Sequence, residues 1–203
     1  GYLYTDFKPQ IAWTLPDLGN GFNAKVAVFD PDDVVADTAA FNATDKSSPR
    51  VEAQITWNGD LLGTGIGMNL WVDGTFQNTE RTTAQAAIIQ GTAAAGADDD
   101  SDVNSAGVGF GGKFTYEGFA LVAAGFHGNA LGIRGQRSQG STLVSTHALD
   151  DVGKERKSYG GYIQGTYSFG QGTNVGYSYG GNFLKKTGND MNTTGVMNHH
   201  IMH

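Results

Sequence analysis

The sequence has no cysteine and few charged residues. Its 203 residues include 13 Lys and Arg and 20 Asp and Glu, which gives a net charge of -7. The lack of cysteine excludes a disulfide framework, zinc thiolate sites and thiol catalysis. The charged fraction of 16% is below the roughly 25% of an average soluble domain. The acidic balance argues against a nucleic-acid partner, which would need a basic surface.

Long apolar runs and catalytic motifs are also lacking. No apolar run approaches the roughly 18 residues of a membrane-spanning helix, a test that does not detect alternating β-strands. The sequence has no G-x-S-x-G elbow, P-loop or H-E-x-x-H motif, so we expect no enzymatic activity and no cofactor. We also expect no metal site. The acidic run Asp98 to Asp102 lacks the EF-hand spacing for Ca²⁺ and favours a solvated loop, and His199 and His203 would lie about 13 Å apart on one strand.

Alternating aromatic residues and abundant glycine are what the sequence has instead. In residues 159 to 169, Tyr159, Ile163, Tyr167 and Phe169 share one face, and glycine and small neutral polar residues form the other. This is strand periodicity. The alternation resumes over residues 174 to 184 after a turn rich in glycine, which predicts a β-hairpin.

Alternating runs predict about eight strands along the chain and no helix. The connections between them alternate in length: four are tight, and three run to twenty residues or more. In an antiparallel up-and-down sheet, all the short turns then lie at one end and all the long loops at the other, as in bacterial outer-membrane barrels. The predicted strands are 9 to 15, 22 to 29, 51 to 57, 62 to 76, 106 to 116, 119 to 127, 159 to 169 and 174 to 184.

One face of each predicted strand carries no charge. The opposite faces carry Lys25, Glu52, Asp73 and Lys113 among neutral polar residues. A soluble β-sandwich would also have uncharged inner faces, so the loop pattern is the stronger indication. The strand at 119 to 127 does not fit the scheme without a bulge or a register shift, because Val122 and Phe126 would point inward and His127 outward.

Aromatic residues flank the predicted tight turns. Trp57, Tyr116, Phe119 and Phe169 lie next to three of them, and Phe22 follows the first. Amphipathic rings collect at membrane interfaces, so this distribution favours an aromatic girdle at the short-turn end.

Three stretches of the chain resemble strand pairs of Gram-negative outer-membrane porins, the general diffusion family. They are "FKPQIAWTLPDLGNGFNAKVAVFDP", "GVGFGGKFTYEGFALVAAGFHG" and "GYIQGTYSFGQGTNVGYSYGGN". The resemblance implies an all-β, antiparallel, up-and-down transmembrane β-barrel of sixteen strands, of which these eight would be about half. Residues 1 to 203 would then be a single, partial barrel domain from the middle of a longer chain, and "GVMNHHIMH" would begin another strand. The loop that folds into the pore of such porins would be absent or reduced to residues 1 to 6.

The resemblance also implies a function. The chain would belong to a homotrimeric channel in the bacterial outer membrane, in contact with lipid and lipopolysaccharide, that passes ions and small hydrophilic solutes. Lys25, Glu52, Asp73 and Lys113 would line the pore, where fixed charges bias which ions enter. Arg134, Arg137 and Arg156 would lie near the pore mouth if their loop folds inward.

Two other hypotheses remain open from the sequence. A small eight-stranded outer-membrane barrel would serve adhesion or structure, because eight strands leave an interior just filled by side chains. A soluble or surface-layer β-sandwich would bury the tyrosine-bearing faces against each other. Strand number and the exposure of those rings separate the three.

Overall fold

A computed structural model describes most of the strand-forming part of the chain. Its described residues are 9–16, 18–31, 34, 44–45, 48–61, 63–81, 102–132, 148–149, 154–170, 172–188 and 199–202, with residues 44, 45, 81 and 199–202 described as backbone only. The strands are β1 (Gln10–Thr14), β2 (Phe22–Phe29), β3 (Thr44–Asp45), β4 (Arg50–Asp60), β5 (Gly67–Arg81), β6 (Asp102–Tyr116), β7 (Phe119–Asn129), β8 (Lys157–Ser168), β9 (Asn174–Leu184) and β10 (His199–Met202).

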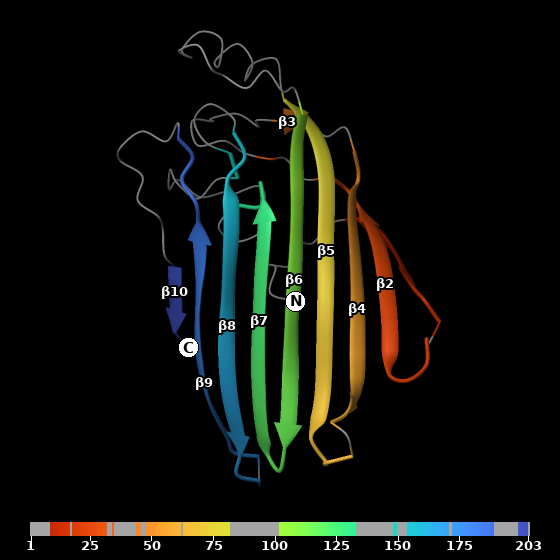
Figure 1. The fold of residues 1–203 in the computed structure, drawn as a ribbon, viewed down its shortest axis with the longest axis vertical. Coiled ribbons are helices and arrows are strands. Elements are labelled where there is room, and N and C mark those ends of the chain that lie inside the picture. Colours follow the sequence, from red (N-terminus) through yellow and green to blue (C-terminus); the bar gives the residue numbers. More distant parts are fainter. Residues whose placement is uncertain are drawn as a thin grey trace.

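All ten strands belong to one antiparallel sheet (Figure 1). Its order is β1-β2-β4-β5-β6-β7-β8-β9-β10, and the two-residue β3 pairs with the end of β5. The all-β, up-and-down fold predicted from the sequence is confirmed, and its eight strands correspond to β1, β2 and β4 to β9. β10 pairs with β9 where the resemblance placed the start of a further strand. Over the described part of the chain, no helix has the length and apolarity needed to cross a membrane.

The predicted strand boundaries were wrong around the second tight turn. The strand expected at 62–76 begins only at Gly67, because Gly63 and Gly65 take left-handed φ angles of 73° and 79°. The Leu61 N–H donates to the Ile66 carbonyl over 2.9 Å and closes this turn. Thr64 and Ile66 therefore do not belong to the outward face of a strand, and Leu62 lies outside the described residues. At the other end, β5 and β6 run past their predicted limits.

Short and long connections lie at opposite ends of the sheet, as predicted. The connections at 15–21, 61–66, 117–118 and 169–173 are short and lie together at the lower end in Figure 1. Residues 30–49, 82–101 and 130–156 connect the other strand ends, and β3 falls within the first of these segments. We call the two ends the short-turn end and the loop end.

The register carries one apolar face across the whole sheet. A row in its middle runs Ala24, Ile55, Val72 and Phe110, and a row near the short-turn end joins Tyr116, Phe119 and Tyr167. β7 pairs regularly with β6 along its whole length, from Tyr116↔Phe119 to Ala106↔Asn129. The bulge or shift expected in this strand is therefore not present, and Val122 and Phe126 lie on the inward face.

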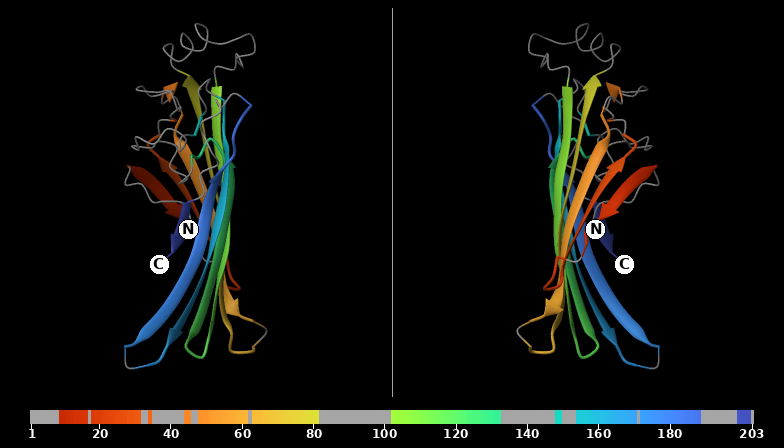
Figure 2. Two further views of the ribbon diagram at one scale, coloured as in Figure 1. Left: turned by 90° about the vertical axis from the view of Figure 1, so that its left-hand side faces the viewer. Right: turned by 90° about the vertical axis from the view of Figure 1, so that its right-hand side faces the viewer.

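The sheet is one curved layer, and its apolar face is convex (Figures 1 and 2). Large rings on that face are exposed, including Trp13 at 65%, Phe110 at 54% and Tyr177 at 63%. A sandwich would bury these rings between two sheets, so the soluble sandwich is contradicted. The first and last strands of the path, β1 and β10, do not pair with each other in the described residues, so these strands do not close an eight-stranded barrel by themselves.

The buried apolar core lies at the loop end. Residues with no exposed surface from four separate parts of the chain cluster there: Val34, Val103, Ala130, Ala148 and Leu149. Along β6, Val103 and Ser105 on the inward face are fully buried, whereas Asp102 and Asn104 on the outward face are exposed. The described residues Val34, Ala130, Ala148 and Leu149 of two long connections therefore pack together with Val103 of the inward face at this end.

Candidate functional site

The inward face brings together the four charged residues that the sequence singled out. Lys25 pairs with Gln54, and Gln54 pairs with Asp73, so Lys25 and Asp73 lie in one row across β2, β4 and β5. Glu52 lies in the next row toward the loop end, opposite Thr75. Lys113 lies nearer the short-turn end, opposite Asn69. The four charged residues therefore face the concave side in three rows, and Lys25 and Asp73 share one of them.

Arg50 is a charged residue of this face that sequence reasoning missed. Its side chain is buried, its Nε lies 3.1 Å from Glu52 Oε1, and its guanidinium group lies over the Phe29 ring at 4.4 Å. The Thr75 hydroxyl also donates to Glu52 Oε1 over 3.4 Å. Arg50 lies two residues before Glu52, so strand alternation would have found it had the strand been started one residue earlier.

Asp73 differs from Glu52 because no cation of the described residues pairs with it. Its Oδ2 is buried and has no hydrogen-bond partner among them, and its Oδ1 lies against Gly109 on β6. A Cβ at position 109 would overlap this carboxyl group. The side chain of Trp71 lies in the same way against Gly111. Glycine on β6 therefore makes room for the large inward side chains of β5.

The chain leaving β7 folds back onto the inward face. Ala130 and Gly132 take φ angles of 51° and 68°, and Leu131 between them is fully buried. The Leu131 side chain lies over Gly107 and Gly128, which are register partners on β6 and β7, and a Cβ at either position would overlap it. We call this contact the Leu131 notch.

Hydrogen bonds hold both ends of the connection between β7 and β8 to the sheet. Ser105 Oγ donates to the Ala130 carbonyl over 2.9 Å, and the Ala130 N–H donates to the Arg156 carbonyl over 2.9 Å. Glu155 Oε1 accepts a hydrogen bond from the Asn104 N–H at 2.6 Å. Arg156 is only 2% exposed, so its charge lies within the packed loop end. The other predicted loop residues lie outside the described part of the chain: Arg134, Arg137, Asp98, Asp99 and Asp100.

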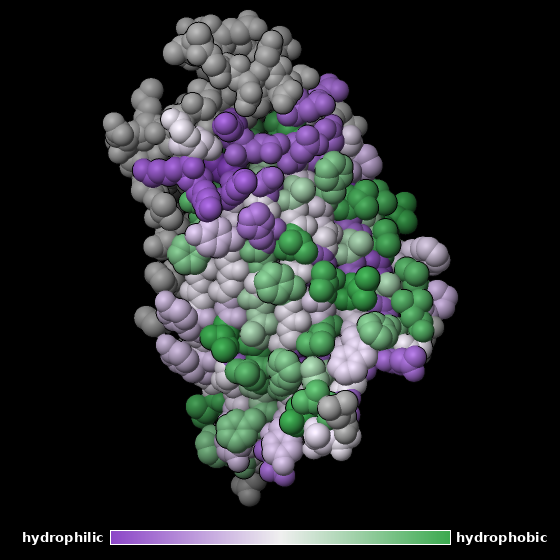
Figure 3. All heavy atoms as spheres, in the orientation of Figure 1, coloured by the Kyte–Doolittle hydropathy of each residue, from purple (hydrophilic) through white to green (hydrophobic). Residues whose placement is uncertain are grey.

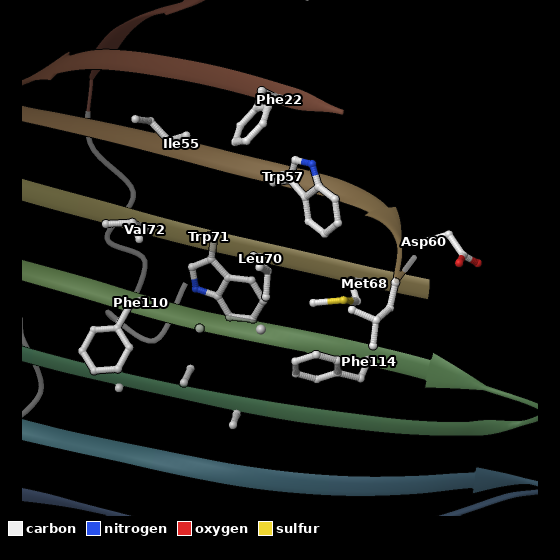
Figure 4. A pocket seen from close by; sticks show the side chains of 16 residues that line it. Phe22, Ile55, Trp57, Asp60, Met68, Leu70, Trp71, Val72, Phe110 and Phe114 are labelled. Atoms are coloured by element: carbon white, nitrogen blue, oxygen red, sulfur yellow. The ribbon is translucent and has the colours of Figure 1, made fainter. Parts of the chain in front are cut away.

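The outward face has a large apolar hollow near the short-turn end (Figure 4). Its volume is about 1170 Å³, and Phe22, Trp57, Met68, Leu70 and Phe114 are among the residues that line it. The Trp57 ring lies 6.4 Å from the Phe22 ring, and its indole N–H donates to the Asn20 carbonyl over 3.0 Å. The polar atom of this ring thus points to the turn while its apolar body lies on the sheet.

Aromatic rings also meet at the neighbouring part of the short-turn end. The Phe119 and Tyr167 rings lie 4.3 Å apart, and the Tyr167 and Phe169 rings meet edge to face at 4.8 Å. Aromatic rings therefore flank the turns before β5, β7 and β9, where the sequence predicted them.

The outward face becomes polar at the loop end. Hydrophilic residues form a band there, above the mixed apolar surface of the lower sheet (Figure 3). The exposed residues of the β5 and β6 ends are Glu80, Asp102 and Asn104, and those of the β8 and β9 ends are Lys157 and Lys185. In the described ranges, no group of three or more His, Asp or Glu side chains could hold a metal ion.

Comparison with known proteins finds a likeness among solved structures. No protein-family model matches the chain, and no curated protein matches it. The crystal structure of the outer membrane channel DcaP of Acinetobacter baumannii is similar, with a TM-score of 0.61 and 16% identity over 88% of this chain and 44% of that one. At this identity the likeness shows the fold alone, which is porin-like. The chain spans less than half the length of that protein.

Proposed function

We propose that this chain forms part of the wall of an outer-membrane channel for passive diffusion of ions and small hydrophilic solutes. The observation that carries the proposal is the uninterrupted register, which gives the sheet one apolar convex face and gathers Lys25, Glu52, Asp73 and Lys113 on the concave face. In a bilayer the first face would meet hydrocarbon and the second a water-filled lumen.

The height of the apolar face fits a bilayer. On β6 it runs from Ala106 to Tyr116, beyond which the outward residues are Asn104 and Asp102 at one end and the exposed Glu117 turn at the other. Ten residue steps span about 33 Å along a strand. A strand tilt of about 40° reduces this to about 25 Å along the membrane normal, the height of the apolar band of outer-membrane barrels.

The aromatic rings support the same orientation. Trp57 and Tyr167 at the short-turn end, and Tyr159 at the loop end, lie near the two borders of this face. Rings with one polar atom are favoured at membrane interfaces, where the apolar body contacts lipid and the polar atom stays hydrated. The apolar hollow beside Trp57 would be filled by lipid chains.

The concave face supplies the chemistry of diffusion. Lys25, Asp73 and Lys113 present fixed charges there, with neutral polar groups such as Gln54 and Asn69 between them. Such a wall replaces part of the hydration of a passing ion and biases its sign. The Leu131 notch would hold the connection between β7 and β8 over the loop end of this face. No catalytic step is part of the proposal.

The decisive experiment measures conductance in a planar lipid bilayer, with the reversal potential under a salt gradient. We expect discrete conductance steps from the full protein. Asp73→Asn removes a negative charge from the wall and should shift the reversal potential toward anion selectivity. Lys113→Gln should shift it toward cation selectivity.

A matched control separates wall charge from net charge. Asp102→Asn removes the same charge as Asp73→Asn, but from the outward face, and should leave the reversal potential unchanged. Absence of any conductance from folded protein would refute the channel. Equal shifts for the two variants would show that Asp73 does not face the permeation path. The homotrimer is tested by closing the channel with voltage. A trimer should lose its conductance in three equal steps.

A further inference from the structure

The outward face carries two lysines side by side at the loop end of β8 and β9. The Lys185 N–H donates to the Lys157 carbonyl over 2.8 Å, which extends the β8–β9 ladder one step beyond Ser158↔Leu184. Lys157 and Lys185 are therefore opposite each other on the face that carries Tyr159 and Phe183. Like charges directly opposite in a sheet repel and destabilise the pair.

Nothing in the described residues neutralises the two ammonium groups. Neither forms an ion pair with a described residue, and both side chains are exposed. The acidic residue nearest in sequence, Glu155, instead binds the Asn104 N–H through Oε1. The Lys185 ammonium group lies over the uncharged Tyr159 ring, whose centroid is 6.0 Å from Nζ. Within the described part of the chain, the positive charge of this pair therefore has no anionic partner.

The pair lies directly above an aromatic platform. The rings of Tyr159 and Phe183 stack with their centroids 5.2 Å apart. On each strand the ring lies two residues from the lysine, on the side of the apolar part of the face. On β7 the partners of Lys157 and Tyr159 are Asn129 and His127, which are uncharged or basic. Rings that favour the membrane interface, followed by cations on the same face, match the order of chemical groups in a lipid from acyl chain to phosphate.

The neighbouring part of the rim has the opposite charge. Glu80 and Asp102 are register partners on β5 and β6, at the same end of the same face. These carboxylates repel an anion, so an anionic headgroup on this rim is directed to β8 and β9. The charge of the rim is thus divided along the sheet, with acidic residues on β5 and β6 and the two lysines at the ends of β8 and β9.

We infer that Lys157 and Lys185 form a binding site for the phosphate of a membrane lipid, with the acyl chains lying on Tyr159 and Phe183. The inference rests on the proposed function, because that function places the convex face in the bilayer. It adds a lipid site of defined chemistry to the channel. The phosphate takes two ammonium groups, and the lipid tail distinguishes it from a free phosphate ion.

The test measures lipid binding to the full protein purified in neutral detergent, by native mass spectrometry. The probe is dioleoyl phosphatidic acid, and dioleoylglycerol serves as the same lipid without phosphate. We expect phosphatidic acid to bind more tightly than dioleoylglycerol. The double variant K157Q/K185Q should bind phosphatidic acid roughly thirtyfold more weakly, which is about five- to sixfold for each lysine.

Two further variants make the result specific. K157R/K185R keeps both charges and should retain binding. K25Q/K113Q removes the same number of charges from the concave face and should also retain it. Equal loss in K25Q/K113Q would overturn the site, because net charge alone would then explain binding. Circular dichroism of each variant identifies any that fail to fold, and the arginine variant then decides the role of charge.

The source of the phosphate and the proposed function are tested separately. Inorganic phosphate at the same concentration should not displace phosphatidic acid, and displacement would overturn a lipid site in favour of a free-anion site. Conductance of the unaltered protein decides the channel. A conducting protein that binds the two lipids equally would overturn only the lipid site, whereas a protein that binds phosphatidic acid without conducting would overturn only the channel.

Discussion

The lower part of the sheet and its loop end use different means of stabilisation. Below the loop end, the sheet has one layer with large exposed apolar side chains, such as Ile55 at 55% and Phe110 at 54%. At the loop end, connections pack on the inward face and bury Leu131 and Val103 completely. The loop end therefore has a core like that of a soluble protein. The outward apolar side chains of the lower sheet can leave water only by contact with something outside the described residues.

Among the substitutions proposed here, removal of the Leu131 side chain should lower the free energy of unfolding most. Leu131→Ala empties the Leu131 notch and should lower the free energy of unfolding by about 2 to 5 kcal/mol, since the side chain is fully buried. Unfolding by urea in lipid vesicles, followed by tryptophan fluorescence, measures it. Leu121→Ala on the outward face, where Leu121 is 45% exposed, is the matched control and should cost much less.

A charge on the convex face of the lower sheet should have the next largest effect. Ile55→Lys places an ammonium group in the middle of the apolar convex face. In a bilayer it should lower the free energy of unfolding by about 2 to 4 kcal/mol. Gln54→Lys changes the adjacent residue, which faces the concave side, and should cost far less. The same urea titration checks both. If the two substitutions cost the same, the convex face does not contact hydrocarbon.

Substitution of a notch glycine should have a smaller effect. Gly128→Ala adds a Cβ that overlaps Leu131 and the Ala106 carbonyl, so we expect a loss of about 1 to 3 kcal/mol from overpacking. Gly165→Ala on β8 adds a Cβ that meets no atom within 4 Å. It should be neutral or slightly stabilising, because alanine restricts the unfolded chain. If both substitutions change the free energy of unfolding equally, Leu131 does not pack against Gly128.

The aromatic contacts at the short-turn end should give the smallest effect. A double-mutant cycle with Phe119→Leu and Tyr167→Leu isolates the interaction of the two rings, which lie 4.3 Å apart. We expect a coupling free energy of about 0.5 to 1.5 kcal/mol. The cycle is measured by urea unfolding of the two single variants and the double variant. A coupling free energy of zero would show that these rings act only through the membrane interface.

The repeating part of this structure could be predicted from the sequence because strands have a period of two. Tyr159, Ile163 and Tyr167 are separated by even numbers of residues, so they share a face of β8. This follows from the local sequence and does not depend on the other strands. The grouping of turns at one end follows from loop length alone. Lys25, Asp73 and Lys113 share a face for the same reason, although their role in permeation stays a prediction.

Features that depend on contacts distant in sequence could not be predicted. Val34 and Leu149 are separated by more than a hundred residues, and nothing local indicates that they meet at the loop end. The bulge expected in β7 was inferred from Val122 and Phe126 facing inward. That inference was wrong because Phe126 lies against Gly160, which makes space for its ring.

The start of β5 was missed for a local reason. The alternation of apolar residues continues through the turn before it, so the period of two did not mark the boundary. The left-handed conformations at Gly63 and Gly65 end the alternating backbone there. A glycine in a sequence permits such a conformation but does not require it.

Because Gly107, Gly109 and Gly111 have no side chains, residues next to them in space can lie directly against the β6 backbone. Asp73 and Trp71 rest against β6, and Leu131 lies along it. A passage bounded by this stretch would therefore be lined beside β6 by the flat sides of Trp71, Asp73 and Leu131, with no β6 side chain projecting between them at these three positions. A large side chain at any of these three positions would displace its neighbour toward the middle of such a passage and narrow it.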